Sequence, residues 1–344
     1  MARWVLHVDL DQFIVAVEIL RRPELAGQPV VVGGDGDPAK RGVVSTASYE
    51  AREHGVHSGL PLRTAARRLP GGIFLPVDRD AYEAASEQVM TALRGIGYVT
   101  EAMGWDEAFV AVPQDARAGP LAVARRIRDV VKAATRLDCS VGIGRNRLQA
   151  KLATGFGKPA GVFLLSYDNW FEVLGDSPTD ALWGIGGKTA RKLAGLGIET
   201  VAALASADPE TLAATFGPAT GPWLVQTACG VSSAEISDEP YVPRGHGREE
   251  TFQENIADWA QVRDQVRKLA AQVARDVAAE GRPVIRIVVK VRYAPFMTYT
   301  RSVTLSEPGR DLAAIEAGAL AALDRFAARG PVRLLGVRAE FAPD

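Results

Sequence analysis

Cysteine and histidine are scarce in this chain, and their scarcity excludes most zinc chemistry. The 344 residues include 2 cysteines, Cys139 and Cys229, and 4 histidines. The cysteines form no CxxC pair, and the histidines lack the HExxH spacing of zinc hydrolases. Any metal site is therefore expected on carboxylates, which favour hard cations such as Mg²⁺ or Mn²⁺.

Long apolar runs are also missing. Every uninterrupted apolar segment is far shorter than the roughly 20 residues that a membrane helix needs. Asp9 and Asp11 interrupt the N-terminal apolar stretch before an export signal develops. We therefore expect a cytoplasmic protein with no membrane segment. Apolar residues make up 47% and charged residues 24%, which predicts a folded chain, and its length predicts two or three domains.

Neither sign of charge dominates, because the formal net charge is −1. This balance argues against a uniformly basic nucleic-acid-binding protein. Residues 241–344 nevertheless carry a small excess of basic side chains, whereas residues 1–240 carry a small excess of acidic ones. The C-terminal part is therefore the better candidate for contact with a polyanion.

Hydrophobic periodicity divides the chain into three parts. In the first, strands are expected at 3–9, 29–34, 43–47, 108–112 and 139–144, and helices at 12–22, 49–54, 60–69, 80–96, 120–137 and 146–155. This order predicts a mixed sheet with helices on one side. A helical unit is expected at 168–230, and a proline-containing linker follows at 237–245. The last part is a β-α-β-β-α-β pattern, with strands at 246–252, 284–293, 298–305 and 332–341 and helices at 258–280 and 311–329.

Two acidic motifs stand beside predicted strands. Asp9-Leu10-Asp11 ends the first strand, and Asp106-Glu107 precedes the strand at 108–112. Carboxylates that converge at strand ends can hold two Mg²⁺ ions, as phosphoryl transfer requires. Solvated strand ends are the alternative, and the acidic pairs alone leave both interpretations open.

Groups that could bind phosphate lie elsewhere in the first part. Tyr49 and Arg52 are three residues apart and share a helix face. Arg52 suits forked contacts with phosphate oxygens, and Lys158 offers a point charge on a loop. Taken singly, each of these residues fits an ordinary surface position better than a phosphate site.

Two features point to DNA binding. Gly184-Ile185-Gly186, followed by Lys188, fits a helix-hairpin-helix whose backbone amides bind a DNA phosphate, although a simple helix turn is the alternative. Strand periodicity predicts a basic face opposite an apolar face of Ile285, Ile287, Val289 and Val291. The basic side chains of this strand and its neighbours are Arg286, Lys290, Arg292, Arg301, Arg333 and Arg338. A solvated sheet face is the alternative to a DNA-backbone platform.

In order, these motifs resemble those of Y-family DNA polymerases of the DinB (DNA polymerase IV) type. The motifs are Asp9-Leu10-Asp11-Gln12-Phe13, Val17-Glu18, Tyr49-Glu50-Ala51-Arg52, Asp106-Glu107, Ser140-Val141-Gly142-Ile143, Lys158-Pro159 and Trp183-Gly184-Ile185-Gly186. The resemblance implies an α+β multidomain right-hand polymerase. Its parts would be a ferredoxin-like palm (1–10 and 73–166), small fingers (11–72), a helical thumb with the helix-hairpin-helix (167–232), a linker (233–245) and a β-α-β-β-α-β little finger (246–344).

The resemblance also implies a site and a reaction. Asp9, Asp106, Glu107 and the Leu10 carbonyl would hold two Mg²⁺ ions, for which Mn²⁺ could substitute. Gln12, Phe13, Thr46, Tyr49, Arg52 and Lys158 would hold the incoming dNTP. Such an enzyme extends a primer on a DNA template past damaged bases, with low fidelity and without proofreading. We expect a monomer. For Asp11, which is not the usual ligand, helix capping is the expected role.

The chain departs from the family pattern at three places. The family usually has an aromatic residue at the position of Ile14, where it collides with a ribose 2′-hydroxyl, so we expect weakened discrimination against rNTPs. Gly104 and Trp105 replace a serine and a small aliphatic residue before the acidic pair. The sequence ends at Phe341-Ala342-Pro343-Asp344 without an evident sliding-clamp peptide, which leaves clamp contact uncertain.

Two other functions compete with the polymerase. A nucleotidyl cyclase can share a palm-like sheet and paired metal carboxylates, but it leaves the helix-hairpin-helix and the basic C-terminal sheet unexplained. A non-catalytic DNA-binding repair scaffold explains those two units but not the first 165 residues.

Overall fold

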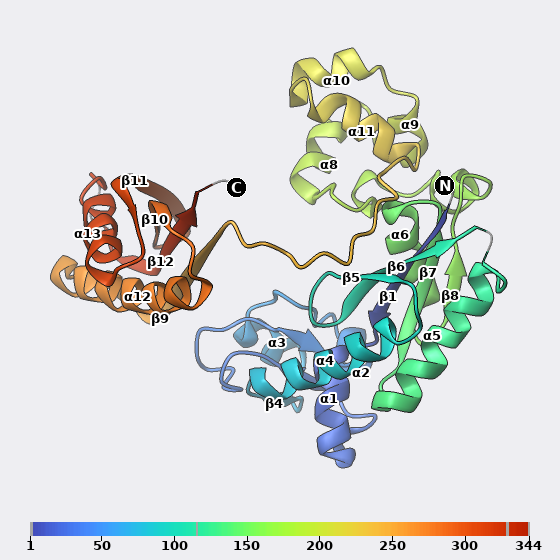
Figure 1. Cartoon of the computed structure of the whole chain (residues 1–344), viewed down its shortest axis with the longest axis horizontal. Helices are drawn as coiled ribbons and strands as arrows, with labels where there is room; N and C mark the ends of the chain where they lie inside the picture. The colour runs from blue at the N-terminus through green and yellow to red at the C-terminus, as the bar shows by residue number, and fades with distance from the viewer. Residues whose placement is uncertain (1–2, 115, 328–329, 343–344) are drawn as a thin grey trace. The chain divides into compact units, whose positions relative to one another are not determined.

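The computed structural model describes residues 3–114, 116–327 and 330–342. Contacts between residues divide the chain into two compact units (Figure 1). The first comprises Met1–Asp37 and Val43–Glu239, and the second comprises Pro38–Gly42 and Pro240–Asp344. None of the helices within the described ranges combines the length and the apolar composition needed to cross a bilayer.

A five-stranded sheet in the order β5-β6-β1-β7-β8 forms the centre of the first unit. Its strands are β1 (Arg3–Leu10), β5 (Val99–Ala102), β6 (Glu107–Pro113), β7 (Cys139–Gly144) and β8 (Val162–Leu164). β1 pairs antiparallel with both β6 and β7, and β8 pairs parallel with β7. β1 therefore lies in the middle of the sheet, with its C-terminal end between the two neighbouring strands.

Helices cover both faces of this sheet. Leu6 and Val8 of β1 face a core that includes α4 (Arg79–Arg94) and α5 (Pro120–Thr135). The expectation of helices on one side was wrong, because α6 (Arg147–Gly157) packs against the opposite face.

Glycines in β7 permit the close approach of α6. A Cβ atom on Gly142 would lie 2.0 Å from the Ala150 carbonyl oxygen and 2.3 Å from the Thr154 nitrogen. A Cβ on Gly144 would lie 2.5 Å from the Ala150 nitrogen. Any larger residue at either position would hold the helix away from the sheet.

A smaller part of the first unit has its own sheet and core. The sheet has the order β3-β2-β4, made of β2 (Val30–Val32), β3 (Thr46–Ala47) and β4 (Ile73–Leu75). The helical segments nearby in sequence are α1 (Phe13–Arg21), η1 (Pro23–Leu25), α2 (Tyr49–Glu53) and α3 (Leu62–Arg68). Its separate core is built around Val31, Val44 and Leu62.

Residues 168–230 are helical, as predicted. The segments are α7 (Trp170–Leu174), η2 (Thr179–Ala181), α8 (Gly187–Ala194), α9 (Val201–Ala205), α10 (Pro209–Phe216) and α11 (Thr220–Ala228). Their core also contains Leu148 and Ala153 of α6, which joins this helical part to the large sheet. After α11, Ile236 is buried against Val5 and Phe109 of the large sheet.

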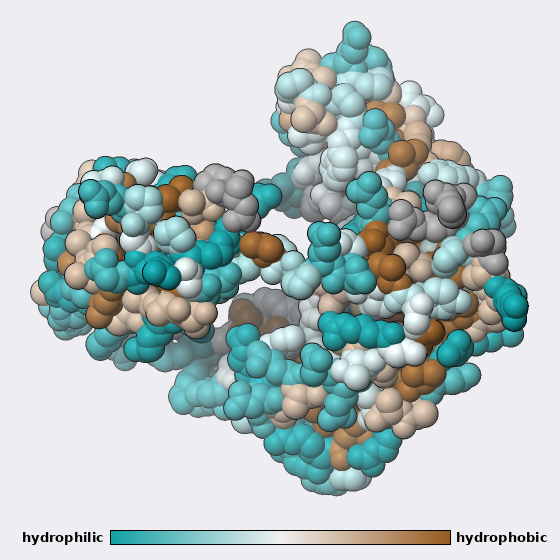
Figure 2. Space-filling model, in the orientation of Figure 1, coloured by the Kyte–Doolittle hydropathy of each residue, from teal (hydrophilic) through white to brown (hydrophobic). Residues whose placement is uncertain are grey.

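The second unit has the predicted β-α-β-β-α-β order. Its elements are β9 (Gly245–Ile256), α12 (Trp259–Glu280), β10 (Val284–Tyr293), β11 (Met297–Gly309), α13 (Leu312–Leu323) and β12 (Val332–Phe341). The sheet order is β11-β10-β12-β9, and α12 and α13 share a core with it. Strongly hydrophobic residues are sparse on the face of this unit that Figure 2 shows.

Two boundaries differ from the predictions or remain open. α13 ends at Leu323, so the predicted helix at 311–329 is too long, and residues 328–329 lie outside the described ranges. The proposed limits of palm, fingers, thumb and little finger stay predictions, and their outermost residues, 1 and 344, also lie outside the described ranges.

Candidate active site

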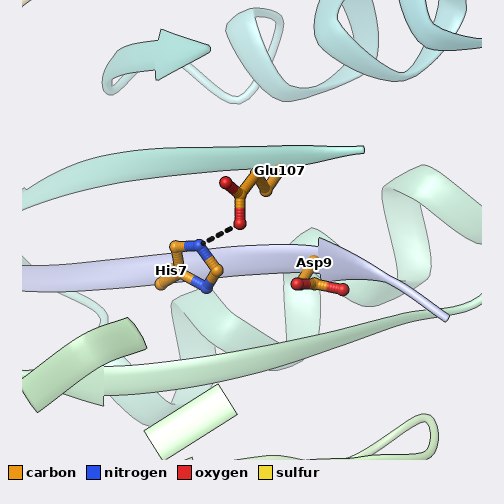
Figure 3. Close-up of side chains that lie close together, drawn as sticks. All are labelled: His7, Asp9 and Glu107. Atoms are coloured by element: carbon orange, nitrogen blue, oxygen red, sulfur yellow. Dashed lines mark hydrogen bonds and ion pairs between the residues drawn. The ribbon is translucent and has the colours of Figure 1, made fainter. Parts of the chain in front are cut away.

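Strand pairing brings three functional side chains to one face of the large sheet. His7 and Asp9 are two residues apart on β1, so both point to the same side. Asp9 pairs directly with Glu107 across the β1–β6 ladder, and directly paired residues also share a face. The close-up in Figure 3 shows the three side chains together at this place. One possible ligand atom from each lies within 4.8 Å of the others.

Glu107 is held by two neighbours. His7 Nε2 lies 3.2 Å from Glu107 Oε2, and the Lys151 ammonium contacts the same oxygen. The other ring nitrogen of His7, Nδ1, lies 2.8 Å from the Thr154 hydroxyl. A neutral His7 that donates from Nε2 to Glu107 accepts at Nδ1 from Thr154, so α6 fixes the orientation of this carboxylate.

The electrostatics of this pair agree with a neutral histidine and an ionised glutamate. Burial lowers the pKa of His7. The hydrogen bond with His7 and, after it, the one from Lys151 outweigh burial and lower the pKa of Glu107 to about 2. Glu107 is therefore an anion throughout the physiological range.

Asp106 reaches the site from a bend. Residues 104–106 form a bend before β6, and the Asp106 carbonyl accepts a hydrogen bond from the Leu10 amide at 2.9 Å. Asp106 lies outside the close group of His7, Asp9 and Glu107. Burial and, after it, the nearby charges of Asp9 and Glu107 raise the pKa of Asp106. Three carboxylates therefore repel one another here, which is the electrostatic condition that a cation relieves.

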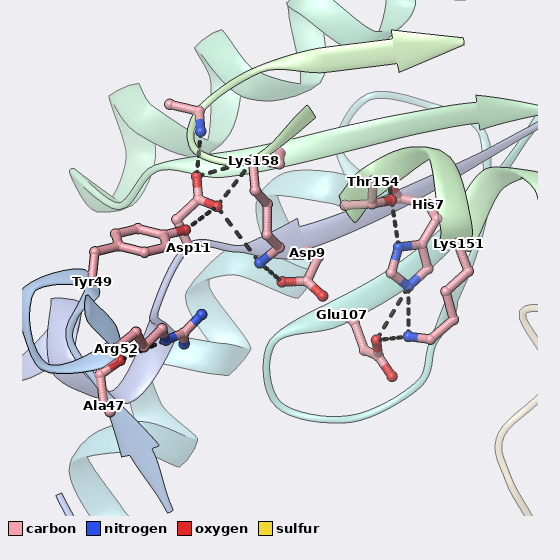
Figure 4. A network of polar contacts seen from close by, with 12 residues as sticks. His7, Asp9, Asp11, Ala47, Tyr49, Arg52, Glu107, Lys151, Thr154 and Lys158 are labelled. Atoms are coloured by element: carbon pink, nitrogen blue, oxygen red, sulfur yellow. Dashed lines mark hydrogen bonds and ion pairs between the residues drawn. The ribbon is translucent and has the colours of Figure 1, made fainter. Parts of the chain in front are cut away.

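Asp11 connects four segments of the chain (Figure 4). It accepts hydrogen bonds from the Tyr49 hydroxyl at 3.1 Å, the Ser140 hydroxyl at 2.9 Å and the Ala160 amide at 2.7 Å. Lys158 lies 3.6 Å from Asp11 and also contacts Asp9. The expected capping role of Asp11 was wrong. The N-cap of α1 is Gln12. The Asp11 carboxylate accepts its hydrogen bonds from residues distant in sequence instead.

Two of the predicted nucleotide-binding residues, Tyr49 and Lys158, lie beside Asp11, and others contact Tyr49. The Arg52 guanidinium stacks over the Tyr49 ring with its central carbon 5.1 Å from the ring centre, so the two share a helix face as expected. The Gln12 side chain accepts a hydrogen bond from the Tyr49 amide at 2.8 Å. The remaining residues of the set are Phe13, buried at the start of α1, Ile14, half-buried on α1, and Thr46 in β3.

The predicted hairpin lies between η2 and α8. Gly184 has a φ of +95°, a conformation that favours glycine, and the Trp223 ring lies 3.0 Å from where its Cβ would be. Gly186 is the N-cap of α8, and a Cβ there would meet nothing within 4 Å. Lys188 is exposed in the first turn of α8. The backbone at Gly186 is therefore accessible to a ligand.

β10 departs at its start from the predicted alternation of basic and apolar side chains. Along β10 the alternation holds from Arg286 to Arg292, but the register shifts between Val284 and Arg286. Because of this bulge, Val284 is buried and Ile285 is only half-buried, so the prediction that Ile285 belongs to the apolar face was wrong.

Arg301 also departs from the predicted basic face. It pairs with Val289, which is buried on the helix-covered side, and its guanidinium stacks over Phe326 at 5.4 Å. Paired residues share a face, so Arg301 points away from Lys290 and Arg292.

Acidic side chains interrupt the basic face of the sheet. Lys290 contacts Glu249 of β9, and Glu340 of β12 lies 3.5 Å from Arg286 and 3.7 Å from Arg338. At the other end of the sheet, Arg333 stacks over Phe296 at 4.6 Å. Burial and, after it, neighbouring guanidinium groups that include Arg292 lower the pKa of Arg333. Arg286, Lys290 and Arg338 therefore have acidic neighbours, whereas Arg333 lies near other guanidinium groups.

Sequence reasoning missed His7, Lys151 and Thr154. The period of two along β1 could have placed His7 beside Asp9. Nothing local could have placed Lys151 and Thr154, because α6 reaches them only through its packing against β1 and β7.

Family models match most of the chain. The impB/mucB/samB family matches residues 8–155, its C-terminal domain matches 243–342, and a SAM-like helix-hairpin-helix tandem matches 181–221.

Curated relatives match over nearly their whole length. DNA polymerase IV 2 of Mycobacterium tuberculosis is 48% identical over 341 residues, covering 99% of this chain and 98% of that protein. DNA polymerase IV of Methanoculleus marisnigri is 38% identical over 340 residues, covering 98% and 94% respectively.

The chain also resembles solved structures over nearly its whole length. A Y-family DNA polymerase chimera of Dbh and Dpo4 matches with a TM-score of 0.85, 26% identity and 98% coverage of both chains. DinB from Sulfolobus solfataricus matches with a TM-score of 0.65, at the same identity and coverage. The ordered motifs, the palm-like sheet with its acidic cluster and these matches lead to one conclusion: the chain belongs to the Y-family DNA polymerases, in the DNA polymerase IV (DinB) group.

Proposed function

We propose that this protein is a translesion DNA polymerase that adds nucleotides to a primer by two-metal nucleotidyl transfer. In the reaction the primer 3′-hydroxyl attacks the α-phosphorus of a dNTP, and pyrophosphate leaves. The observation that carries the proposal is the pairing of Asp9 with Glu107, which places both carboxylates on one face beside Asp106.

The donor set fits hard divalent cations. Asp9, Asp106, Glu107 and the Leu10 carbonyl offer oxygen ligands, which Mg²⁺ and Mn²⁺ prefer. When bound, two such ions would activate the primer hydroxyl and neutralise the charge that develops on the phosphates. Asp106, whose pKa burial raises, would stay ionised beside a cation. His7 and Thr154 hold the Glu107 carboxylate in one orientation before any substrate arrives.

The residues on the side of Asp9 away from Glu107 support the binding of a triphosphate. Arg52 and Lys158 supply positive charge, and Gln12, Phe13 and Thr46 supply backbone or hydroxyl groups near the N-terminus of α1. Asp11 holds Tyr49 in place and lies beside Lys158, so these groups are positioned before a triphosphate binds. Ile14 on α1 lacks the aromatic ring that would exclude a ribose 2′-hydroxyl, so we propose weak discrimination against rNTPs.

DNA would be held through its backbone. The hairpin amides at Gly184 and Gly186, with Lys188, would take a phosphate, and the sheet of the second unit would take others. The side chains proposed for that sheet are Arg286, Lys290, Arg292, Arg333 and Arg338. Arg301 is left out of this set because of its position on the helix-covered side.

Primer extension tests the proposal. A labelled primer–template with Mg²⁺ or Mn²⁺ and dNTPs should give a ladder of extended products. Asp106→Ala should abolish extension while leaving most of the DNA binding, and Asp129→Ala, an exposed change on α5, serves as the control. A gel shift without extension by the wild-type protein would contradict the proposal and favour a scaffold. A cyclic product from NTP alone would favour a cyclase.

A further inference from the structure

Lys151 occupies a place between the carboxylates and the helical part that carries the hairpin. It lies on α6, and its ammonium contacts Glu107 and lies 3.4 Å from His7 Nε2. On its other side, the same ammonium lies 5.6 Å from the centre of the Trp183 ring, within the range of cation–π attraction. The Lys151 ammonium is therefore shared between Glu107 and Trp183, which adjoins the hairpin.

The contact with Glu107 competes with metal binding. A divalent cation held by Asp9 and Glu107 would bind the same carboxylate that the Lys151 ammonium contacts, and it carries the same sign of charge. Two cations at one carboxylate repel each other in a partly buried site. The flexible stem of lysine allows the ammonium to move, and the Trp183 ring, whose centre is 5.6 Å away, offers it a second favourable position.

A cavity extends from the carboxylates to the hairpin on the side to which Lys151 would move. Its volume is about 430 Å³, within the range of sites for small organic groups. His7, Asp9, Lys151 and Lys158 line one part, and Asp180, Trp183, Gly184 and Ile185 line another. This step rests on the proposed function: a primer whose 3′ end reaches Asp9, and whose backbone is held at the hairpin, must pass this cavity.

We propose that Lys151 is a positioning residue that exchanges partners. It pairs with Glu107 in the free protein and with a phosphate near the primer 3′ end when a divalent cation takes Glu107. The exchange makes cation and primer–template bind cooperatively. Each must then raise the affinity for the other by the same factor.

Binding of a primer–template that ends in a dideoxynucleotide tests the exchange without chemistry. Fluorescence anisotropy of the full-length protein would compare affinity in Mg²⁺ with affinity in EDTA at matched ionic strength. We expect the wild-type protein to bind at least about fivefold more tightly in Mg²⁺. Lys151→Met should reduce this ratio to about one, and Lys151→Arg should retain it. Lys132→Met, a change at an exposed lysine of α5, is the matched control and should keep the wild-type ratio.

Binding of Mn²⁺ to the free protein supplies a second readout, by electron paramagnetic resonance. Lys151→Met should bind Mn²⁺ more tightly than the wild-type protein, because the competing ammonium is gone. The proposed exchange would be overturned if Lys151→Met kept the wild-type ratio of affinities in Mg²⁺ and EDTA, or lost DNA affinity equally with and without Mg²⁺. It would also be overturned if Lys151→Met bound Mn²⁺ with the same affinity as the wild-type protein. If thermal unfolding shows that Lys151→Met does not fold, Lys151→Gln carries the same expectations. Failure of the wild-type protein to extend an ordinary primer would instead contradict the proposed function.

Discussion

The Tyr49 hydroxyl donates a hydrogen bond to Asp11 at 3.1 Å, across 38 residues of sequence. Asp11 is 5% exposed, and burial and, after it, the charge of Asp11 raise the pKa of Tyr49. This bond fixes the phenol at the place where a triphosphate is proposed to bind. The bond therefore holds a residue of the proposed nucleotide-binding set in a fixed orientation.

Removal of this bond should weaken nucleotide binding. We expect Tyr49→Phe and Asp11→Asn each to raise the KM for dNTP about fivefold or more, since a hydrogen bond contributes about 1 kcal/mol. The double variant should be less impaired than the product of the two, because both changes affect the Tyr49–Asp11 hydrogen bond. Steady-state extension kinetics measure this, with Ser140→Ala as a control that removes another partner of Asp11. Fully multiplicative effects would rule out the coupling.

In metal-free protein, the ionisation of Glu107 should make the free energy of unfolding vary with pH. Its folded pKa, about 2, lies below the ordinary value of 4.5, so its ionised form stabilises the fold above about pH 4.5. That contribution is lost as the pH falls from 4.5 towards 2. Glu107→Gln should therefore be less stable than the wild-type protein at pH 7 and nearly equal to it near pH 2. Urea unfolding in EDTA across this range measures the difference, and a constant difference would contradict the assignment.

A side chain at Gly142 should destabilise the protein. Since a Cβ would lie 2.0 Å from the Ala150 carbonyl oxygen, Gly142→Ala must push α6 away from β7. We expect a loss of about 3 kcal/mol or more in the free energy of unfolding. Gly104→Ala is the control, because the nearest atom to a Cβ there, an Asp106 oxygen, is 3.9 Å away, and it should change stability by about 0.5 kcal/mol at most. Equal effects of the two changes would refute the packing argument.

Sugar selection should respond to the size of residue 14. Ile14→Phe should raise the preference for dNTP over rNTP at least about tenfold, or about 1.4 kcal/mol, because an aromatic ring would meet the 2′-hydroxyl. Ile14→Leu keeps the volume and should leave the preference unchanged. Single-nucleotide insertion kinetics with matched dNTP and rNTP measure this. If the wild-type protein and Ile14→Phe reject rNTPs equally, the idea fails.

The two faces of the C-terminal sheet should differ in their effect on DNA affinity. Arg292→Ala should weaken primer–template binding and reduce the slope of log affinity against log salt by about 0.9, the value for one lost phosphate contact. Arg301→Ala should leave the slope unchanged, since Arg301 stacks over Phe326 on the helix-covered side. Anisotropy titrations at several salt concentrations would measure both variants. An equal loss of DNA affinity in the two variants would show that DNA binding does not distinguish the two faces of the sheet.

Local sequence patterns determined much of this protein. The period of two gave the alternation from Arg286 to Arg292, and the period of helices gave α12 within one residue. The ordered motifs carried the family resemblance, because each motif is a short segment whose chemistry is local. These features depend on neighbours in sequence, which a single chain displays directly.

Tertiary pairing decided the rest. The β1–β6 register set Asp9 opposite Glu107, and a bulge in β10 turned Ile285 out of the apolar face. Packing of α6 on Gly142 brought Lys151 and Thr154 to residues that lie more than 40 positions away in sequence. Register, bulges and helix docking follow from the summed packing of distant segments, so no local pattern contains them.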